Sequence, residues 1–299
     1  MHRHFKLIAS LLLLTIGTVA PAQDKLKDGT TLAWTKDITV GQAQLKNDSV
    51  SLPALTVPVY ESKAGDVWGL LKKELPGASF KKQGSLMKAA GVSLSPAQAA
   101  PADVLAQVVQ DKKQGMSTLT FAFLKAGTNE PMDAAQLEPV MRELGVKLNK
   151  AVVQGQLSQW EKALGKAGSK AEGAAKDQAK AQSRMTKAQS ELEKITREKS
   201  KLQNERAVLQ KEVDLYNQKW TLSQDPKDLK KLAKARDRIT KNDNQMAKSM
   251  DSEAKVQRDI SKSSSAVPDA QKAKDQKTAA QADVQRTVDA LRNKLNSIR

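Results

Sequence analysis

The sequence predicts an α+β N-terminal domain followed by a long antiparallel α-helical coiled-coil hairpin with a broken return arm. Apolar residues alternate with polar ones in several short runs before residue 125, as in half-buried strands. From Val153 to Trp220 they recur at steps of four and three, the spacing of a coiled-coil seam. A short polar turn and Pro226 follow, and the chain beyond is long enough to pair with the first helix.

Residues 1–22 have the three regions of a cleavable secretory signal peptide. Basic residues precede an apolar run over 7–19, and Ala20 and Ala22 are the small residues that cleavage before Gln23 requires. As a helix this run spans about 20 Å, against about 30 Å for a bilayer core, which favours cleavage over a membrane anchor. We therefore expect a periplasmic or secreted protein with no transmembrane segment after cleavage.

The residue types present argue against catalysis. The chain has no cysteine, and both of its histidines, His2 and His4, lie in the predicted signal peptide. The mature chain therefore lacks the commonest general base, the commonest metal ligand and the thiol nucleophile. We expect no enzymatic activity, no metal and no cofactor. A hydrolase based on carboxylates in residues 23–152 is the alternative.

Positive charge is concentrated in the C-terminal half. Residues 23–152 contain 16 basic and 13 acidic side chains, whereas residues 153–299 contain 32 and 20. Such a field attracts anionic envelope surfaces, nucleic acid or acidic proteins, or else it only keeps a helical surface soluble. Aromatic residues are not interleaved with the densest cluster, which disfavours nucleic acid. The candidate anion-binding residues are Lys230, Lys231, Lys234, Arg236, Arg238 and Lys241.

Residues 23–152 predict one small domain, since about 130 residues can bury a single core. Leu119, Phe121 and Phe123 alternate along the clearest strand, which follows another strand and a polar turn, as in a hairpin. The predicted strands are 52–60, 104–108 and 116–124, with weaker candidates at 31–40 and 79–94. The predicted helices are 64–75 and one that opens at Pro131 with Leu137, Met141, Leu144 and Leu148 on its buried stripe.

A coiled-coil hairpin is predicted for residues 153–299. Seventeen of the twenty positions at the alternating spacing in its first helix are apolar or aromatic. We call these positions the seam; a seam this long at a period of 3.5 is typical of a left-handed coiled coil. The seam comprises Val153, Leu157, Trp160, Leu164, Ala167, Ala171, Ala174, Gln178, Ala181, Met185, Ala188, Leu192, Ile195, Lys199, Leu202, Arg206, Leu209, Val213, Tyr216 and Trp220.

The return arm is predicted to be interrupted. Asp225 suits a helix N-cap and Pro226 the first helical position, while serines 263–265 and Pro268 suggest a break. The helices are therefore expected at about 153–222, 226–262 and 270–299. A three-helix bundle, with dimerisation to cover the seam, is the alternative. Residues expected on the buried stripe of the second helix are Leu229, Leu232, Ile239, Met246, Met250, Val256 and Ile260, and on that of the third Ala273, Ala280, Val284, Val288, Leu291, Leu295 and Ile298.

Tyr216 and Trp220 occupy the last two seam positions before the turn. They are interpreted as a hydrophobic plug at the tip, or alternatively as a contact for a partner.

A signal peptide, a small β-containing domain and a basic helical hairpin together resemble the layout of Skp-type periplasmic chaperones. In those proteins helical arms enclose unfolded outer-membrane proteins. Here the predicted domain precedes the whole hairpin, whereas strands flank the hairpin on both sides in that family. The order also resembles uncharacterised exported coiled-coil proteins of Gram-negative bacteria. These similarities are architectural, and no residue motif carries over.

The sequence therefore favours a non-enzymatic cell-envelope interaction or scaffold protein that uses a long coiled-coil arm. A holdase chaperone that attracts acidic unfolded clients is the alternative within the same broad class. Partners are expected among envelope proteins or at an anionic envelope surface, and a homo-oligomer is compatible with the seam.

Overall fold

The computed structural model describes residues 26, 30–47, 50–75, 77–93 and 101–299. The predicted signal peptide and its cleavage site lie outside the described residues. The chain divides into two compact units. Unit 1 contains the described residues up to Glu161 together with Arg286–Arg299, and unit 2 contains Lys162–Gln285.

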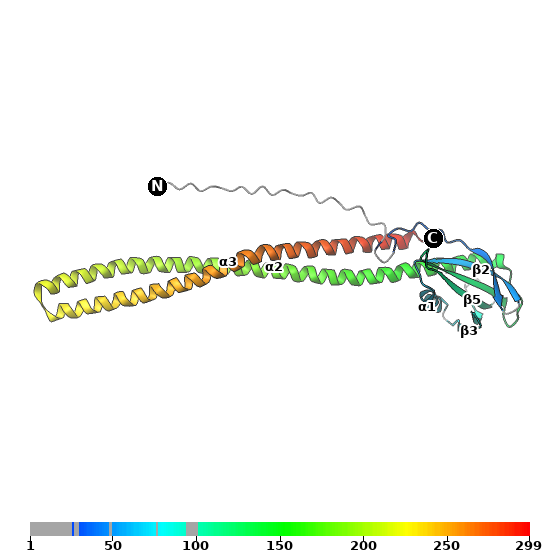
Figure 1. Ribbon diagram of the computed structural model, residues 1–299, viewed down its shortest axis with the longest axis horizontal. Coiled ribbons are helices and arrows are strands. Elements are labelled where there is room, and N and C mark those ends of the chain that lie inside the picture. Colours follow the sequence, from blue (N-terminus) through cyan, green and yellow to red (C-terminus); the bar gives the residue numbers. More distant parts are fainter. Residues whose placement is uncertain (1–25, 27–29, 48–49, 76, 94–100) are drawn as a thin grey trace. The chain divides into compact units, whose positions relative to one another are not determined.

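A six-stranded antiparallel sheet forms the centre of unit 1 (Figure 1). Its strand order is β1-β2-β6-β5-β4-β3, so a hairpin and a four-stranded meander meet where β2 pairs with β6. Helix α1 connects them between β2 and β3. The elements are β1 Gly41–Asn47, β2 Val50–Tyr60, α1 Ala64–Glu74, β3 Lys81–Gln83, β4 Leu86–Val92, β5 Ala102–Asp111 and β6 Met116–Lys125.

Most of the predicted strands are confirmed. β5 and β6 form the expected hairpin, in which Asp111 pairs with Met116. The weak segment 79–94 contains β3 and β4. The weak strand at 31–40 is wrong, because the first strand begins at Gly41. Trp34 and Ile38 instead pack their side chains against the core, so this segment is held by side-chain contacts rather than by a strand ladder.

The main core lies between one face of the sheet and the helices. Alternate residues of β6, Leu119, Phe121 and Phe123, meet the predicted helical stripe that includes Met141 and Leu148. Ile298, at the other end of the chain, is 1% exposed in the same core. Burial of these side chains, worth roughly 1.5–3 kcal/mol each, therefore stabilises unit 1 and holds the chain's C-terminus.

Two long helices, α2 Ala134–Ser223 and α3 Pro226–Ser297, make up the rest of the chain. The helix predicted to open at Pro131 and the one predicted from residue 153 are one continuous helix, because the buried stripe passes without interruption into the seam. The turn predicted before Pro226 is confirmed. Asp225 Oδ1 accepts the backbone N–H of Lys227 at 2.8 Å, the bond of an N-cap.

The broken return arm is wrong, since α3 continues through Pro268. The hydroxyls of Ser264 and Ser265 donate to helix carbonyls three residues earlier, at 2.8 and 3.0 Å, and so are compatible with the helix. Pro268 removes one backbone donor, but the carbonyl that loses it belongs to Ser264, an exposed residue. Val267 is half-buried on the seam side, so packing also favours the continuous helix.

Within unit 2, α2 and α3 run antiparallel, side by side, on either side of the turn (Figure 1). Lys199 pairs with Glu253, while Arg206 Nε lies 2.6 Å from Asp243 Oδ1. Closer to the turn, Arg238 Nη1 lies 2.9 Å from Glu212 Oε2. Residues progressively later along α2 therefore pair with residues progressively earlier along α3.

Burial along the helices follows the predicted spacing. Every seam position of α2 is buried or half-buried except Arg206, which is exposed. On α3 the assignments of Leu229 and Met250 to the stripe are wrong, since they are 45% and 50% exposed, and those of Ala273 and Ala280 are wrong as well, since both are exposed. They fall one step off the spacing of three and four, and Ala235, Asn242 and Ser249 occupy buried positions there instead. Hydrophobic type alone therefore misassigned these four positions.

Candidate functional site

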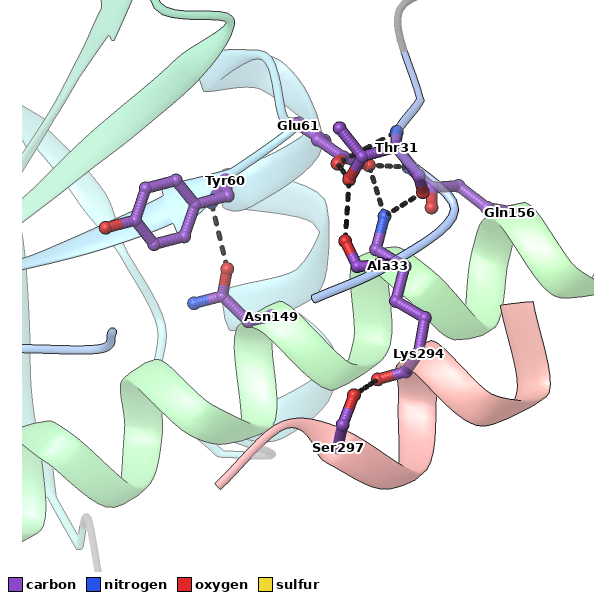
Figure 2. A network of polar contacts seen from close by, with 8 residues as sticks. All are labelled: Thr31, Ala33, Tyr60, Glu61, Asn149, Gln156, Lys294 and Ser297. Atoms are coloured by element: carbon purple, nitrogen blue, oxygen red, sulfur yellow. Dashed lines mark hydrogen bonds and ion pairs between the residues drawn. The ribbon is translucent and has the colours of Figure 1, made fainter. Parts of the chain in front are cut away.

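A partly buried polar cluster ties four segments of unit 1 together (Figure 2). Glu61 follows β2 directly and adopts a left-handed φ of 52°. Thr31 belongs to the irregular segment before β1, and Gln156 lies on α2. Lys294 comes from the last turns of α3. We call these four residues the Glu61 cluster.

Glu61 accepts hydrogen bonds on both carboxylate oxygens. Lys294 Nζ lies 2.7 Å from Oε2, and Gln156 Nε2 donates to the same oxygen at 2.9 Å. Thr31 donates its hydroxyl to Oε1 at 2.5 Å and its backbone N–H at 3.2 Å. Lys294 also donates to the carbonyl of Thr31 at 2.8 Å. The cluster thus satisfies a charged pair that is largely withdrawn from water.

The two charges differ in exposure, since the Lys294 side chain is 0% exposed and that of Glu61 is 20% exposed. Burial raises the pKa of Glu61, but hydrogen bonds from Lys294, Thr31 and Gln156 outweigh it, and the pKa lies below its ordinary value. Glu61 is therefore held as a carboxylate. The cluster acts as a clamp between β2 and the end of α3.

A second clamp holds α2 against β2. Asn149 is 1% exposed and accepts the backbone N–H of Tyr60 at 2.9 Å. Its amide donates to the carbonyls of Pro58 and Gly145, at 2.9 and 2.8 Å. Gly145 lets the two elements approach, since a Cβ there would lie 2.3 Å from Val57 Cγ2.

Carboxylates share two hollows of unit 1. Glu61 and Asp66 line one of about 440 Å³, and Asp37 and Glu138 line another of about 700 Å³. Glycosidase-type acid catalysis needs one carboxyl with a raised pKa beside an ionised one. Glu61 has a lowered pKa and its oxygens are occupied by donors, so Glu61 lacks the raised pKa that the acid of such a pair needs.

Four lysines surround a third hollow, of about 440 Å³, beside the Glu61 cluster. Lys36 comes from the segment before β1 and Lys63 from the N-cap of α1. Lys112 and Lys113 form the turn between β5 and β6. Glu61 is the one carboxylate among the described lining residues. We call this the lysine hollow.

The six basic residues proposed from sequence are all exposed on α3 in unit 2. At 100° per residue, five of them lie within an arc of about 100°, and Arg236 lies apart. Two are engaged, since Lys231 Nζ lies 3.7 Å from Asp228 Oδ1 and Arg238 pairs with Glu212. The cluster is thus a convex helical face rather than an enclosed site.

Tyr216 and Trp220 are both half-buried near the turn. The Tyr216 ring has Lys219 Nζ 5.9 Å and Lys231 Nζ 5.7 Å from its centroid. The Tyr216 ring therefore makes a cation–π contact with each of the two ammonium groups.

The sequence reasoning missed the Glu61 cluster and the lysine hollow. One signal was present, because Lys294 lies between Leu291 and Ile298 on the stripe of the last helix. A lysine at a stripe position indicates a buried partner. The convergence of the four lysines has no sequence signal, since they lie on segments that only the sheet brings together.

Among the described residues, no group of three or more acidic, cysteine or histidine side chains is arranged to hold a metal ion. None of the helices within the described ranges has an apolar stretch sufficient to span a bilayer. No model of a known protein family matches the chain, and a search of curated proteins finds no match.

Proposed function

We propose that the protein is a non-enzymatic interaction or scaffold protein of the cell envelope, in which the helices of unit 2 form an antiparallel coiled coil that presents a binding surface. The carrying observation is the spacing of three and four between the buried and half-buried positions of both helices, from Leu192 to Leu202 and from Leu232 to Ser249. Such spacing is that of knobs packing into holes. The outgoing helix of unit 2, residues 162–223, is about 93 Å long at 1.5 Å per residue.

The exterior of these helices supports a role in binding rather than in catalysis. Apolar exposed residues near the turn, Val208, Leu215 and Leu222, lie seven residues apart on α2, with exposures of 65%, 49% and 87%. A helical partner needs apolar side chains at this spacing. The surrounding surface is basic, which favours acidic partner surfaces.

Site-specific crosslinking in the native envelope tests the proposal. A photoreactive amino acid placed at Leu222, one of these exposed apolar positions, should yield discrete adducts with an envelope protein. The matched control carries the same amino acid at Lys180, an exposed α2 position away from these apolar residues, and should yield far less adduct. Equal labelling at both positions, or none at Leu222, would contradict a binding surface near the turn.

An aggregation assay distinguishes the scaffold from a holdase. A scaffold should leave the aggregation of a urea-unfolded outer-membrane protein unchanged at equimolar ratio. Suppression at that ratio, abolished by high salt, would support the chaperone mechanism instead, because basic arms would then attract acidic clients.

A further inference from the structure

The lysine hollow concentrates positive charge in the part of the chain that has little of it. Residues 23–152 have a surplus of three charges, 16 basic against 13 acidic, yet four lysines gather around one hollow. They arrive from three segments that are distant in sequence, so helical periodicity does not account for their convergence. Four like charges around a concave surface repel one another unless an anion lies between them.

The lysines of the hollow lack the partners that other lysines of unit 1 have. Lys125 pairs with Glu130 at 2.6 Å, and Lys147 pairs with Glu143 at 2.8 Å. In the described part of the chain, no carboxylate lies within ion-pair distance of Lys36, Lys63, Lys112 or Lys113.

Two carboxylates near the hollow accept backbone donors. Asp111 Oδ1 accepts the backbone N–H groups of Lys113 and Gln114, at 2.9 and 3.1 Å. Asp66 Oδ2 accepts the backbone N–H of Lys63 at 3.4 Å. Glu61 reaches the lining itself, but Lys294 binds it from the protein interior and offsets its charge. The lysine ammonium groups therefore remain available to a ligand.

We infer that the lysine hollow binds a ligand carrying at least two phosphate groups or one pyrophosphate. Lysine presents a compact point charge with three donors, which suits the oxygens of phosphate, whereas planar carboxylates are better matched by the arginine fork. The hollow's volume of about 440 Å³ is within the range of small-molecule sites. Tyr60 contributes one wall, and Lys36 Nζ lies 6.0 Å from its ring centroid.

Isothermal titration calorimetry of the mature chain with pyrophosphate, at low ionic strength, tests this inference. The variant K112Q/K113Q should bind on the order of tenfold more weakly, since it loses two charge-assisted contacts. The matched control is K81Q/K82Q, which removes the same charge from exposed β3 and should bind as the wild type does. Because both pairs of residues are exposed, circular dichroism should be unchanged in both variants.

Vesicles distinguish the source of the phosphate. If the ligand is a lipid headgroup, vesicles with cardiolipin, whose headgroup carries two phosphates, should retain the wild type but not K112Q/K113Q, and pyrophosphate should release it. If the ligand is soluble, pyrophosphate should bind without vesicle retention. The inference is overturned by absent pyrophosphate binding at low ionic strength, by equal weakening in K81Q/K82Q, or by tighter binding of polyglutamate through the same lysines.

Discussion

Replacement of Lys294 by methionine should weaken unit 1, because it leaves the carboxylate of Glu61 without its ammonium partner. The variant loses two hydrogen bonds, to Glu61 at 2.7 Å and to the carbonyl of Thr31 at 2.8 Å. Glu61 keeps its donors from Thr31 and Gln156 and is 20% exposed, so water offsets part of the loss. We expect the free energy of unfolding to fall by about 2–3 kcal/mol, below the about 3–5 kcal/mol typical of a broken buried pair.

The reverse change, Glu61→Gln, should cost more, about 3–5 kcal/mol, because the ammonium that remains is 0% exposed. The double variant should be more stable than Glu61→Gln alone, since methionine can fill the site without charge. Urea unfolding monitored by tryptophan fluorescence in a Trp220→Phe background reports unit 1 through the three tryptophans that remain, Trp34, Trp68 and Trp160.

Lys147→Met serves as the control. Its ion pair with Glu143 has side chains 46% and 51% exposed, and exposed pairs contribute less than about 1 kcal/mol. If Lys294→Met costs no more than Lys147→Met, the Glu61 cluster does not clamp α3 and the reasoning fails.

The carboxylate of Glu61 also makes the free energy of unfolding of unit 1 depend on pH in the acidic range. The pKa of Glu61 in the folded state lies below its ordinary value of 4.5. Folding therefore favours the ionised form, so its stabilisation is complete above about pH 4.5 and is lost as the pH falls through the folded-state pKa. The stability difference between wild type and Glu61→Gln should shrink over that range.

Three other changes test separate parts of the molecule. Gly145→Ala should destabilise unit 1 by about 1–3 kcal/mol despite its better helix propensity, because its Cβ would clash with Val57, whereas Gly155→Ala, with open space around it, should stabilise by about 0.5–1 kcal/mol; thermal unfolding of both decides the sign. Asn242→Leu should raise the melting temperature, since Asn242 is 3% exposed with its Oδ1 unpartnered, and a lower melting temperature would show that its bond to α2 outweighs that cost. N-terminal sequencing of the protein from the envelope should begin at Gln23, and a chain that starts at Met1 would indicate an anchor.

Elements with strong local periodicity were predictable from the sequence. The alternation in β6 and the spacing along α2 each repeat over several residues, and the short turn before Pro226 carries its own cap. The effect of a single proline was a poorer predictor of a helix end where a long helix is packed on both sides of it. Pro268 looked like a break because its missing donor is a local property, while the packing that favours a continuous helix extends along the whole seam.

The buried stripe of α3 shows that local criteria also fail for single residues. Leu229 and Met250 seemed better stripe members than Asn242 and Ser249, because hydrophobic type was the available criterion. The partner helix decides which angular positions are covered, and the two apolar residues fall outside that arc.

The amino-acid sequence by itself determined the division into a strand-bearing region and a long helical region, and the position of the turn before Pro226. Tertiary structure alone decided that Lys294 reaches Glu61, 233 positions away, and that four lysines from separate segments surround one hollow. Periodicity reports a residue's relation to its near neighbours along the chain. A charge finds its partner only when the sheet and the end of α3 have packed into one core, and that packing depends on contacts between residues far apart in sequence.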